Sequence, residues 1–132
     1  YLNNVGSILV GTNTYWEGLD LPNDQLEILL ISKIPFSNPY NPIVQSKIDY
    51  YKDLGMNSFL DYQLPESILK LRQGIGRLIR SQKDMGVCIL TDPRILQKAY
   101  GQAILDSFPL DANIYTNSDT LLNEINNFLG NN

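Results

Sequence analysis

Two short apolar runs constrain the fold of this chain more than any other feature. Leu26–Ile31 contains one polar residue and Val87–Leu90 contains none, which is typical of strands buried on both faces. Segments with the helical spacing of apolar residues lie between them, over 43–54 and 65–79. Strands that alternate with helices indicate a parallel sheet, so we expect an α/β domain. Ser7–Val10 is predicted to be a further short buried strand.

The rest of the chain is assigned from local signals. A length of 132 residues, with 43 % apolar residues, fits one domain with one packed core. Thr116 and Asp119 suit a capping box for the last helix. The remaining expectations are a proline-rich surface loop over 34–42, an irregular stretch over 56–63, a helix from Asp92-Pro93 to about Leu105, a short strand within 110–115 and a helix over about 119–129.

The helix predicted over 65–79 carries an unusual polar face. Gln73, Arg77 and Arg80 have the spacing i, i+4 and i+7, which places them within roughly 60° of one another on a helix. A guanidinium stays charged and pairs bidentately with phosphate oxygens, so this face suits a phosphate ligand. The alternative is an ordinary solvated basic face on an amphipathic helix.

Two further features of this region favour a ligand. Gly74 and Gly76 each cost a helix roughly 1 kcal/mol relative to Ala, which indicates that something approaches the backbone closely. The whole chain has a net charge of −4, which argues weakly against general nucleic-acid binding. Residues 70–94, however, hold six cations against two carboxylates, a net charge of +4 that leaves −8 on the remainder. Positive charge is therefore concentrated where a phosphate would bind.

Five segments together resemble one family. Residues 73–80, with the spacing Q-x-x-G-R-x-x-R, resemble motif VI of superfamily 2 helicases, and residues 11–20 resemble motif V of the DinG/XPD branch. Lys33–Pro42 resembles the K-L-P-F-x-x-P-x-D-P segment of that branch, with Asn41 in place of the commoner Asp. Leu64-Pro65 and Asp92-Pro93-Arg94 match as well, in the same order. The resemblance is to the second RecA-like helicase domain of a DinG-type protein.

The resemblance implies roles for the helix over 65–79. In related helicases the motif VI arginines reach the γ-phosphate of ATP held across a domain cleft. Arg77 and Arg80 are therefore the catalytic candidates. Gln73 and Gly76, on the same motif, are candidates for nucleotide contacts.

The resemblance also implies roles for the 11–20 loop. Gly18, Asp20 and Glu17 are candidates on the nucleotide side, and the hydroxyls of Thr12 and Thr14 are candidates for the nucleic-acid backbone. A carboxylate does not bind phosphate without a cation because both are anionic. Asp20 or Glu17 would instead accept a hydrogen bond from a ribose hydroxyl, a water or an arginine. The alternative is a turn with solvated acids.

The loop over 33–42 combines a cation with aromatic rings. Lys33, Phe36 and Tyr40 have the chemistry of a single-strand groove, in which bases stack and phosphates meet positive charge. The alternative, which we weigh equally, is a rigid proline-rich connection with Phe36 turned inward.

Some chemistry is missing from the sequence. No Gly-Lys pair and no Asp-Glu pair occurs, so neither a Walker A loop nor a DEAH-type carboxylate pair is present. We expect a first motor domain outside this chain to hold ATP and Mg²⁺, and the chain alone not to hydrolyse ATP. One cysteine, Cys88, cannot hold an iron–sulfur cluster, which needs about four. The chain has no histidine, so catalytic triads and metal sites built on histidine are excluded.

The expected compartment follows from similar observations. No apolar run approaches the roughly 18 residues of a membrane helix, and no signal peptide is visible at the start. A single cysteine cannot form an internal disulfide. We therefore expect a cytoplasmic protein with no membrane partner.

The predicted fold is a RecA-like three-layer domain with a mostly parallel sheet, incomplete at its N-terminus. Residues 1–132 are predicted to form part of the second motor domain of an ATP-dependent DNA helicase. Its expected partners are single-stranded DNA and the first helicase domain of the same chain. The alternatives are a non-catalytic nucleic-acid or small-ligand-binding α/β module, and the helicase-like half of a fused exonuclease.

Overall fold

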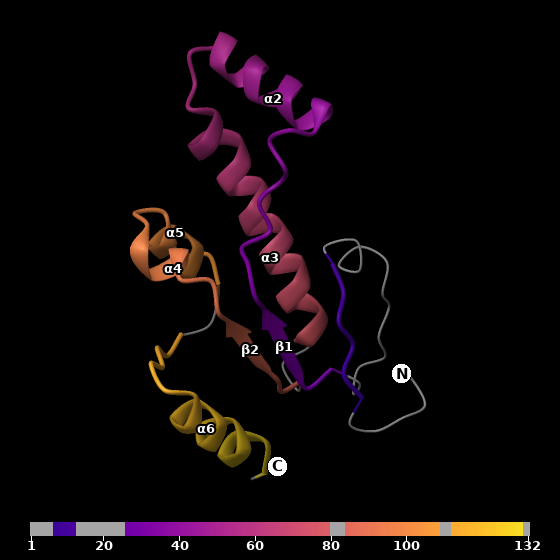
Figure 1. Cartoon of the computed structure of the whole chain (residues 1–132), viewed down its shortest axis with the longest axis vertical. Helices are drawn as coiled ribbons and strands as arrows, with labels where there is room; N and C mark the ends of the chain where they lie inside the picture. Colours follow the sequence, from indigo (N-terminus) through magenta and orange to yellow (C-terminus); the bar gives the residue numbers. More distant parts are fainter. Residues whose placement is uncertain (1–6, 13–25, 80–83, 109–111, 131–132) are drawn as a thin grey trace.

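The computed structural model describes residues 7–12, 26–79, 84–108 and 112–130. Two parallel strands, β1 (Ile28–Ile31) and β2 (Val87–Leu90), lie side by side near the middle of the molecule (Figure 1). Ile28 lies opposite Val87, and Ile31 lies opposite Leu90. Both apolar runs are therefore strands, and their parallel pairing confirms the prediction of an α/β arrangement.

The helices of the described residues mostly follow the predicted pattern. In chain order they are α2 (Pro42–Asp53), the π-helical turn η1 (Phe59–Gln63), α3 (Leu64–Leu78), α4 (Arg94–Gln97), α5 (Gly101–Asp106) and α6 (Ser118–Gly130). The helices predicted over 43–54, 65–79 and 119–129 correspond to α2, α3 and α6. None of these described helices is long and apolar enough to cross a membrane.

Helix α3 organises the core. Its apolar side lies along the sheet, and Leu71 is fully buried there. The core cluster joins α3 to β1, α4 and α5 through six side chains: Ile31, Ile34, Leu64, Leu71, Ile95 and Ile104. A Cβ on Gly86 would lie 2.5 Å from the Leu78 side chain and 3.2 Å from the Glu27 carbonyl oxygen. The C-terminal end of α3 therefore reaches the amino ends of both strands, so α3 runs antiparallel to them.

Helix α2 begins and ends where its sequence predicts. Asn41 is its N-cap, and the Asn41 side chain accepts a hydrogen bond from the Ile43 N–H at 3.0 Å. Asn and Asp are about equally good N-caps, which explains why Asn41 can stand where the family commonly has Asp. The helix ends at Asp53, and Leu54 is followed by Gly55, whose φ of +73° suits glycine.

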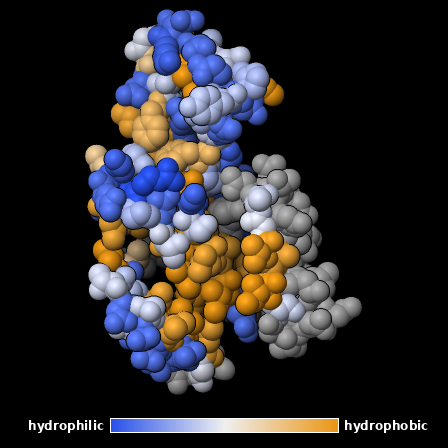
Figure 2. Space-filling view, viewed as in Figure 1, coloured by the Kyte–Doolittle hydropathy of each residue, from blue (hydrophilic) through white to orange (hydrophobic). Residues whose placement is uncertain are grey.

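The strands are less buried than predicted. Ile28 and Leu30 are 41 % and 59 % exposed, while Ile31 is buried. Figure 2 shows apolar side chains gathered on the lower half of the molecule, in the region of the two strands. The reason is that α3 covers one face of β1, whereas no described element covers the face that bears Leu30.

The predicted strand over 7–10 is absent from the structure. These residues have no regular structure, and Ile8 and Val10 are 89 % and 87 % exposed. Within the described residues, the sheet consists of β1 and β2 alone. A β-branched apolar run becomes a strand only when a neighbouring strand pairs with its backbone, and 7–10 has no such neighbour here.

Two local predictions were also wrong. Within 56–63, η1 forms because the Asn57 side chain accepts hydrogen bonds from Phe59 and Leu60. The helix predicted over 93–105 breaks into α4 and α5, since Lys98 is extended and Gly101 packs against the Ile95 backbone with no room for a Cβ.

The C-terminal part of the chain differs from its prediction in two details. Asn117, rather than Thr116, accepts the hydrogen bond from the Asp119 N–H, at 2.7 Å. Residues 112–115 form no strand, since no described strand lies beside them.

Candidate ATP and nucleic-acid site

The polar side of α3 forms a continuous stripe. Glu66, Lys70, Gln73 and Arg77 follow one another at intervals of three or four residues, which at about 100° per residue keeps them within roughly 60° on one side of the helix. Gln73 is exposed and Arg77 is half-buried. Arg80 lies outside the described residues.

The glycines of motif VI fall on two sides of α3. Gly74 is buried, on the side that packs against the sheet. Gly76 is exposed, and a Cβ added there would meet no described atom within 4 Å. The close approach predicted at Gly76 is therefore not made by the described part of this chain, and the space beside this backbone is open to a ligand.

Of the motif V candidates, the structure describes Thr12 alone. Thr14, Glu17, Gly18 and Asp20 lie outside the described residues. Thr12 is exposed.

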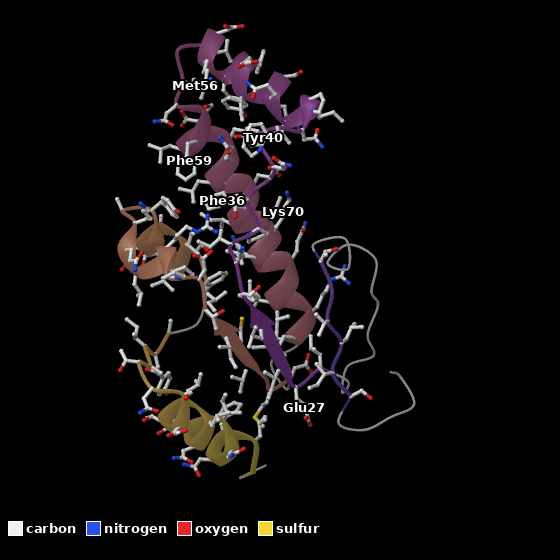
Figure 3. The ribbon with its side chains drawn as sticks, in the orientation of Figure 1. Glu27, Phe36, Tyr40, Met56, Phe59 and Lys70 are labelled. Carbon is white, nitrogen blue, oxygen red and sulfur yellow. The ribbon has the colours of Figure 1, made fainter. Side chains whose placement is uncertain are left out.

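The loop after β1 separates its three candidates. Tyr40 is 91 % exposed and Lys33 is also exposed. Phe36 is half-buried and packs against the core. Its ring centroid lies 5.5 Å from that of Phe59 and 5.7 Å from that of Tyr100. Phe36 and Phe59 can be followed in Figure 3. Phe36 is thus turned inward, as in the alternative interpretation of this loop.

A buried carboxylate ties this loop to the end of β2. Asp92 is 6 % exposed and accepts a hydrogen bond from the Ile34 N–H at 2.8 Å. The Arg94 guanidinium donates to both carboxylate oxygens, at 2.6 to 3.1 Å, and lies 5.4 Å from the centre of the Phe36 ring. Hydrogen bonds from Arg94, and then from Ile34, hold the pKa of Asp92 well below its usual range although burial opposes this.

The structure brings some of the predicted residues together and separates others. Lys33 and Tyr40 follow the carboxyl end of β1, whereas Gln73 and Arg77 lie toward the amino ends of the strands. Helix α3 connects the two groups along its length. Cys88 is half-buried and packs against the core. Partial burial raises the pKa of its thiol to about 11, so the thiol stays uncharged at neutral pH.

Sequence reasoning missed the side chains that join the loop to α3. These are Ser37, Glu66 and Lys70, which contact one another across 29 to 33 residues of chain. Glu66 and Lys70 have the i, i+4 spacing of a helical ion pair, which the sequence displays. Ser37 has no comparable signal, because a lone serine in a loop does not indicate its distant partner.

The parallel pairing of β1 and β2 and the Q-x-x-G-R-x-x-R spacing on α3 agree with the resemblance to a helicase C-terminal domain. The family model described as the helicase C-terminal domain matches residues 1–111, and the chain belongs to that family.

Its relatives specify the branch. The ATP-dependent DNA helicase DinG of Photobacterium profundum is 48 % identical over 103 residues, which are 78 % of this chain and 15 % of the relative. The 3'-5' exonuclease DinG of Bacillus subtilis is 44 % identical over 103 residues, 78 % of this chain and 11 % of the relative. The ATP-dependent DNA helicase YoaA of Haemophilus influenzae is 38 % identical over 109 residues, 83 % of this chain and 17 % of the relative. The predicted DinG-type helicase C-terminal domain is therefore confirmed, and this chain spans 11 to 17 % of the length of these relatives.

Proposed function

We propose that this chain acts as the second motor domain of a longer ATP-dependent DNA helicase of the DinG type. The observation that carries the proposal is the α3 stripe. Gln73 and Arg77 keep the motif VI spacing on one polar side of α3, and the space beside the Gly76 backbone is open. The whole domain would have the three-layer RecA-like fold and work in the cytoplasm.

The chemistry of the stripe suits one half of an ATP site. It offers guanidinium and amide donors, and motif VI adds Arg80 beyond the described residues. Such donors stabilise the charge that develops on the γ-phosphoryl group during its transfer. ATP and Mg²⁺ would be held mainly by the first motor domain, and the metal would neutralise phosphate charge there. Arg77 and Arg80 would complete the site when the two domains close.

The nucleic-acid side would be the loop after β1. Lys33 supplies a cation and Tyr40 an exposed ring, which are the two elements of a single-strand groove. Phe36 has a supporting role in this proposal, because its ring is engaged by Phe59, Tyr100 and Arg94. Thr12 and Thr14 would contact the DNA backbone, with Gly18, Asp20 and Glu17 toward the nucleotide.

A second candidate function is the helicase-like half of a fused exonuclease. It is kept because one relative with 44 % identity is named a 3'-5' exonuclease. Release of nucleotides from labelled single-stranded DNA by the longer protein would favour this candidate over a helicase without a nuclease.

The proposed function is tested by ATP hydrolysis. The longer protein that carries this chain is expected to hydrolyse ATP and to do so several-fold faster when single-stranded DNA is added. Phosphate release would be measured with and without a single-stranded oligonucleotide, with duplex DNA as the comparison. Absence of nucleotide hydrolysis under both conditions would contradict the motor function and favour a binding module.

The DNA side is tested at Tyr40. We expect Tyr40→Ala in the longer protein to weaken single-strand binding by about tenfold, since stacking of a base on an aromatic ring contributes about 1–3 kcal/mol. Fluorescence anisotropy with a labelled oligonucleotide would measure the Kd. The matched control is Tyr50→Ala, because Tyr50 is 61 % exposed on α2. Equal Kd values for the two variants would remove Tyr40 from the DNA surface.

A further inference from the structure

Three polar side chains join the loop after β1 to the middle of α3. The Ser37 hydroxyl donates to the Glu66 carboxylate at 2.8 Å, and the Lys70 ammonium donates to the same hydroxyl oxygen at 2.8 Å. Lys70 Nζ also lies 3.6 Å from the second carboxylate oxygen of Glu66. We call these residues the Ser37 bridge. Figure 3 shows Lys70 extending from the middle of α3.

The geometry of the bridge is demanding. One hydroxyl is at once a donor and an acceptor, so the loop and the helix must keep one relative position for both bonds to form. The side chains of Lys70 and Glu66 are only 27 % and 28 % exposed, so water competes less for them than for a surface pair. Both bonds involve a charged partner, which strengthens them.

The bridge lies between the two groups of candidate ligand contacts. On the loop, Ser37 falls between Lys33 and Tyr40 in the chain. On α3, Lys70 precedes Gln73 and Arg77 along the same stripe. The rise from Lys70 to Arg77 is about 10 Å for seven residues of helix. A displacement of the loop would therefore reach the stripe through a short, rigid path.

The other anchors of the loop lead elsewhere. The Ile34 N–H is bound to Asp92, at the end of β2. Phe36 packs on Phe59, Tyr100 and Arg94. Of the loop anchors described above, the Ser37 bridge is the one that reaches the polar side of α3.

We propose that the Ser37 bridge couples DNA binding on the 33–42 loop to the ATP-contacting side of α3. The inference rests on the proposed function. Ser37, Glu66 and Lys70 are positioning residues: they contact neither ligand, and they hold Gln73 and Arg77 where the loop sets them. When DNA fixes the loop, the bridge fixes Lys70 and, through the helix, Gln73 and Arg77. Loss of the bridge leaves both sites intact but uncouples them.

The experiment is Ser37→Ala in the longer protein. We expect the DNA-stimulated kcat for ATP hydrolysis to fall by about tenfold, the size expected for loss of hydrogen bonds to charged partners. The rate of hydrolysis without DNA and the Kd for single-stranded DNA are expected to stay within about twofold of the unaltered protein. The melting temperature is expected to stay within a few degrees of it. Ser37→Thr keeps the hydroxyl and should restore most of the stimulation.

Two control pairs match the chemistry of the change. Ser46→Ala is the control for Ser37→Ala: it also removes a serine hydroxyl, but one whose hydrogen bond stays within α2, to the Pro42 carbonyl. Lys70→Met should reproduce the loss of stimulation, whereas Lys52→Met, which removes a cation from an exposed ion pair on α2, should not. Ser37→Ala and Lys70→Met combined should be no worse than the more severe of the two, because both remove one bridge.

The outcomes separate the inference from the proposed function. If the unaltered protein is stimulated by DNA and Ser37→Ala is stimulated equally, the coupling role is overturned. A parallel loss of basal hydrolysis, stimulated hydrolysis and melting temperature would make the bridge merely structural and also overturn it. If the unaltered protein shows no DNA-stimulated hydrolysis, the proposed function fails and the inference falls with it.

Discussion

Replacing Arg80 by alanine in the longer protein that carries this chain is expected to lower kcat for ATP hydrolysis by about 10³- to 10⁵-fold. That is the range for arginines that stabilise charge on a transferring phosphoryl group, and it corresponds to roughly 4–7 kcal/mol of activation free energy. Arg80 is the last residue of the Q-x-x-G-R-x-x-R motif that begins at Gln73, and it follows the end of α3 at Leu78. Nucleotide affinity should change much less, because the first motor domain is proposed to hold most of the ATP. Phosphate release and nucleotide Kd would be measured on the same preparations.

Two companion variants sharpen the test at Arg80. Arg80→Lys should rescue poorly, since an ammonium lacks the planar fork that binds two phosphate oxygens. Arg72→Ala is the matched control, because Arg72 is an exposed arginine on α3 outside the stripe, and it should leave kcat near normal. Near-normal kcat in Arg80→Ala would return this residue to the alternative of a solvated basic face. A fall in melting temperature with a proportional loss of activity would indicate a structural residue.

The sequence predicted what depends on local pattern. The apolar runs at 28–31 and 87–90 became paired strands because each is bordered by polar or turn residues and too short for a helix. Helix α3 was predicted to within one residue at each end, since Pro65 suits its first turn and its apolar spacing is regular. Gln73 and Arg77 were assigned to one side of this helix, and that geometry follows directly from helical periodicity.

The sequence did not predict what depends on distant partners. Phe36 in a proline-rich loop has no periodic neighbours that would assign it to the core, and its orientation is decided by Phe59 and Tyr100, far along the chain. The break between α4 and α5 arises because the Gly101 backbone packs against Ile95. A helix pattern alone continues through that position, since glycine is tolerated within a helix at a cost of about 1 kcal/mol.

The strand predicted at Ser7–Val10 shows the same limit in another form. Its composition suits a strand, but a strand is stabilised by backbone pairing and by side chains packed on its faces. Among the described residues no strand pairs with it, and Ile8 and Val10 are 89 % and 87 % exposed. Propensity was sufficient to predict β1 and β2 because they pair with each other.

Asp92→Asn is expected to destabilise the 132-residue chain by about 2–3 kcal/mol. Removing one partner of a fully buried ion pair costs about 3–5 kcal/mol. We expect a smaller loss here because the Arg94 side chain is 38 % exposed, so water can replace part of the lost contact. Both carboxylate oxygens of Asp92 accept hydrogen bonds, from the Ile34 N–H and from Arg94. The asparagine amide has only one oxygen that can accept, so one of these donors loses its partner. Urea unfolding at neutral pH would measure the change. Asp106→Asn, an exposed acid on α5 whose partner is Gln102, should change stability by about 0.5 kcal/mol or less.

The pH dependence distinguishes the lost charge from lost packing. The pKa of Asp92 is lowered in the folded chain, while an unfolded aspartate titrates near 3.9. A lowered folded pKa contributes stability that is fully present above the unfolded value and is lost as the pH falls toward the folded one. The stability gap between the unaltered chain and Asp92→Asn should therefore be constant from about pH 8 to pH 5 and should narrow below about pH 4. A gap that stays constant through this acid range would mean that Asp92 acts through its shape, and that its ion pair with Arg94 adds little to holding the 33–42 loop.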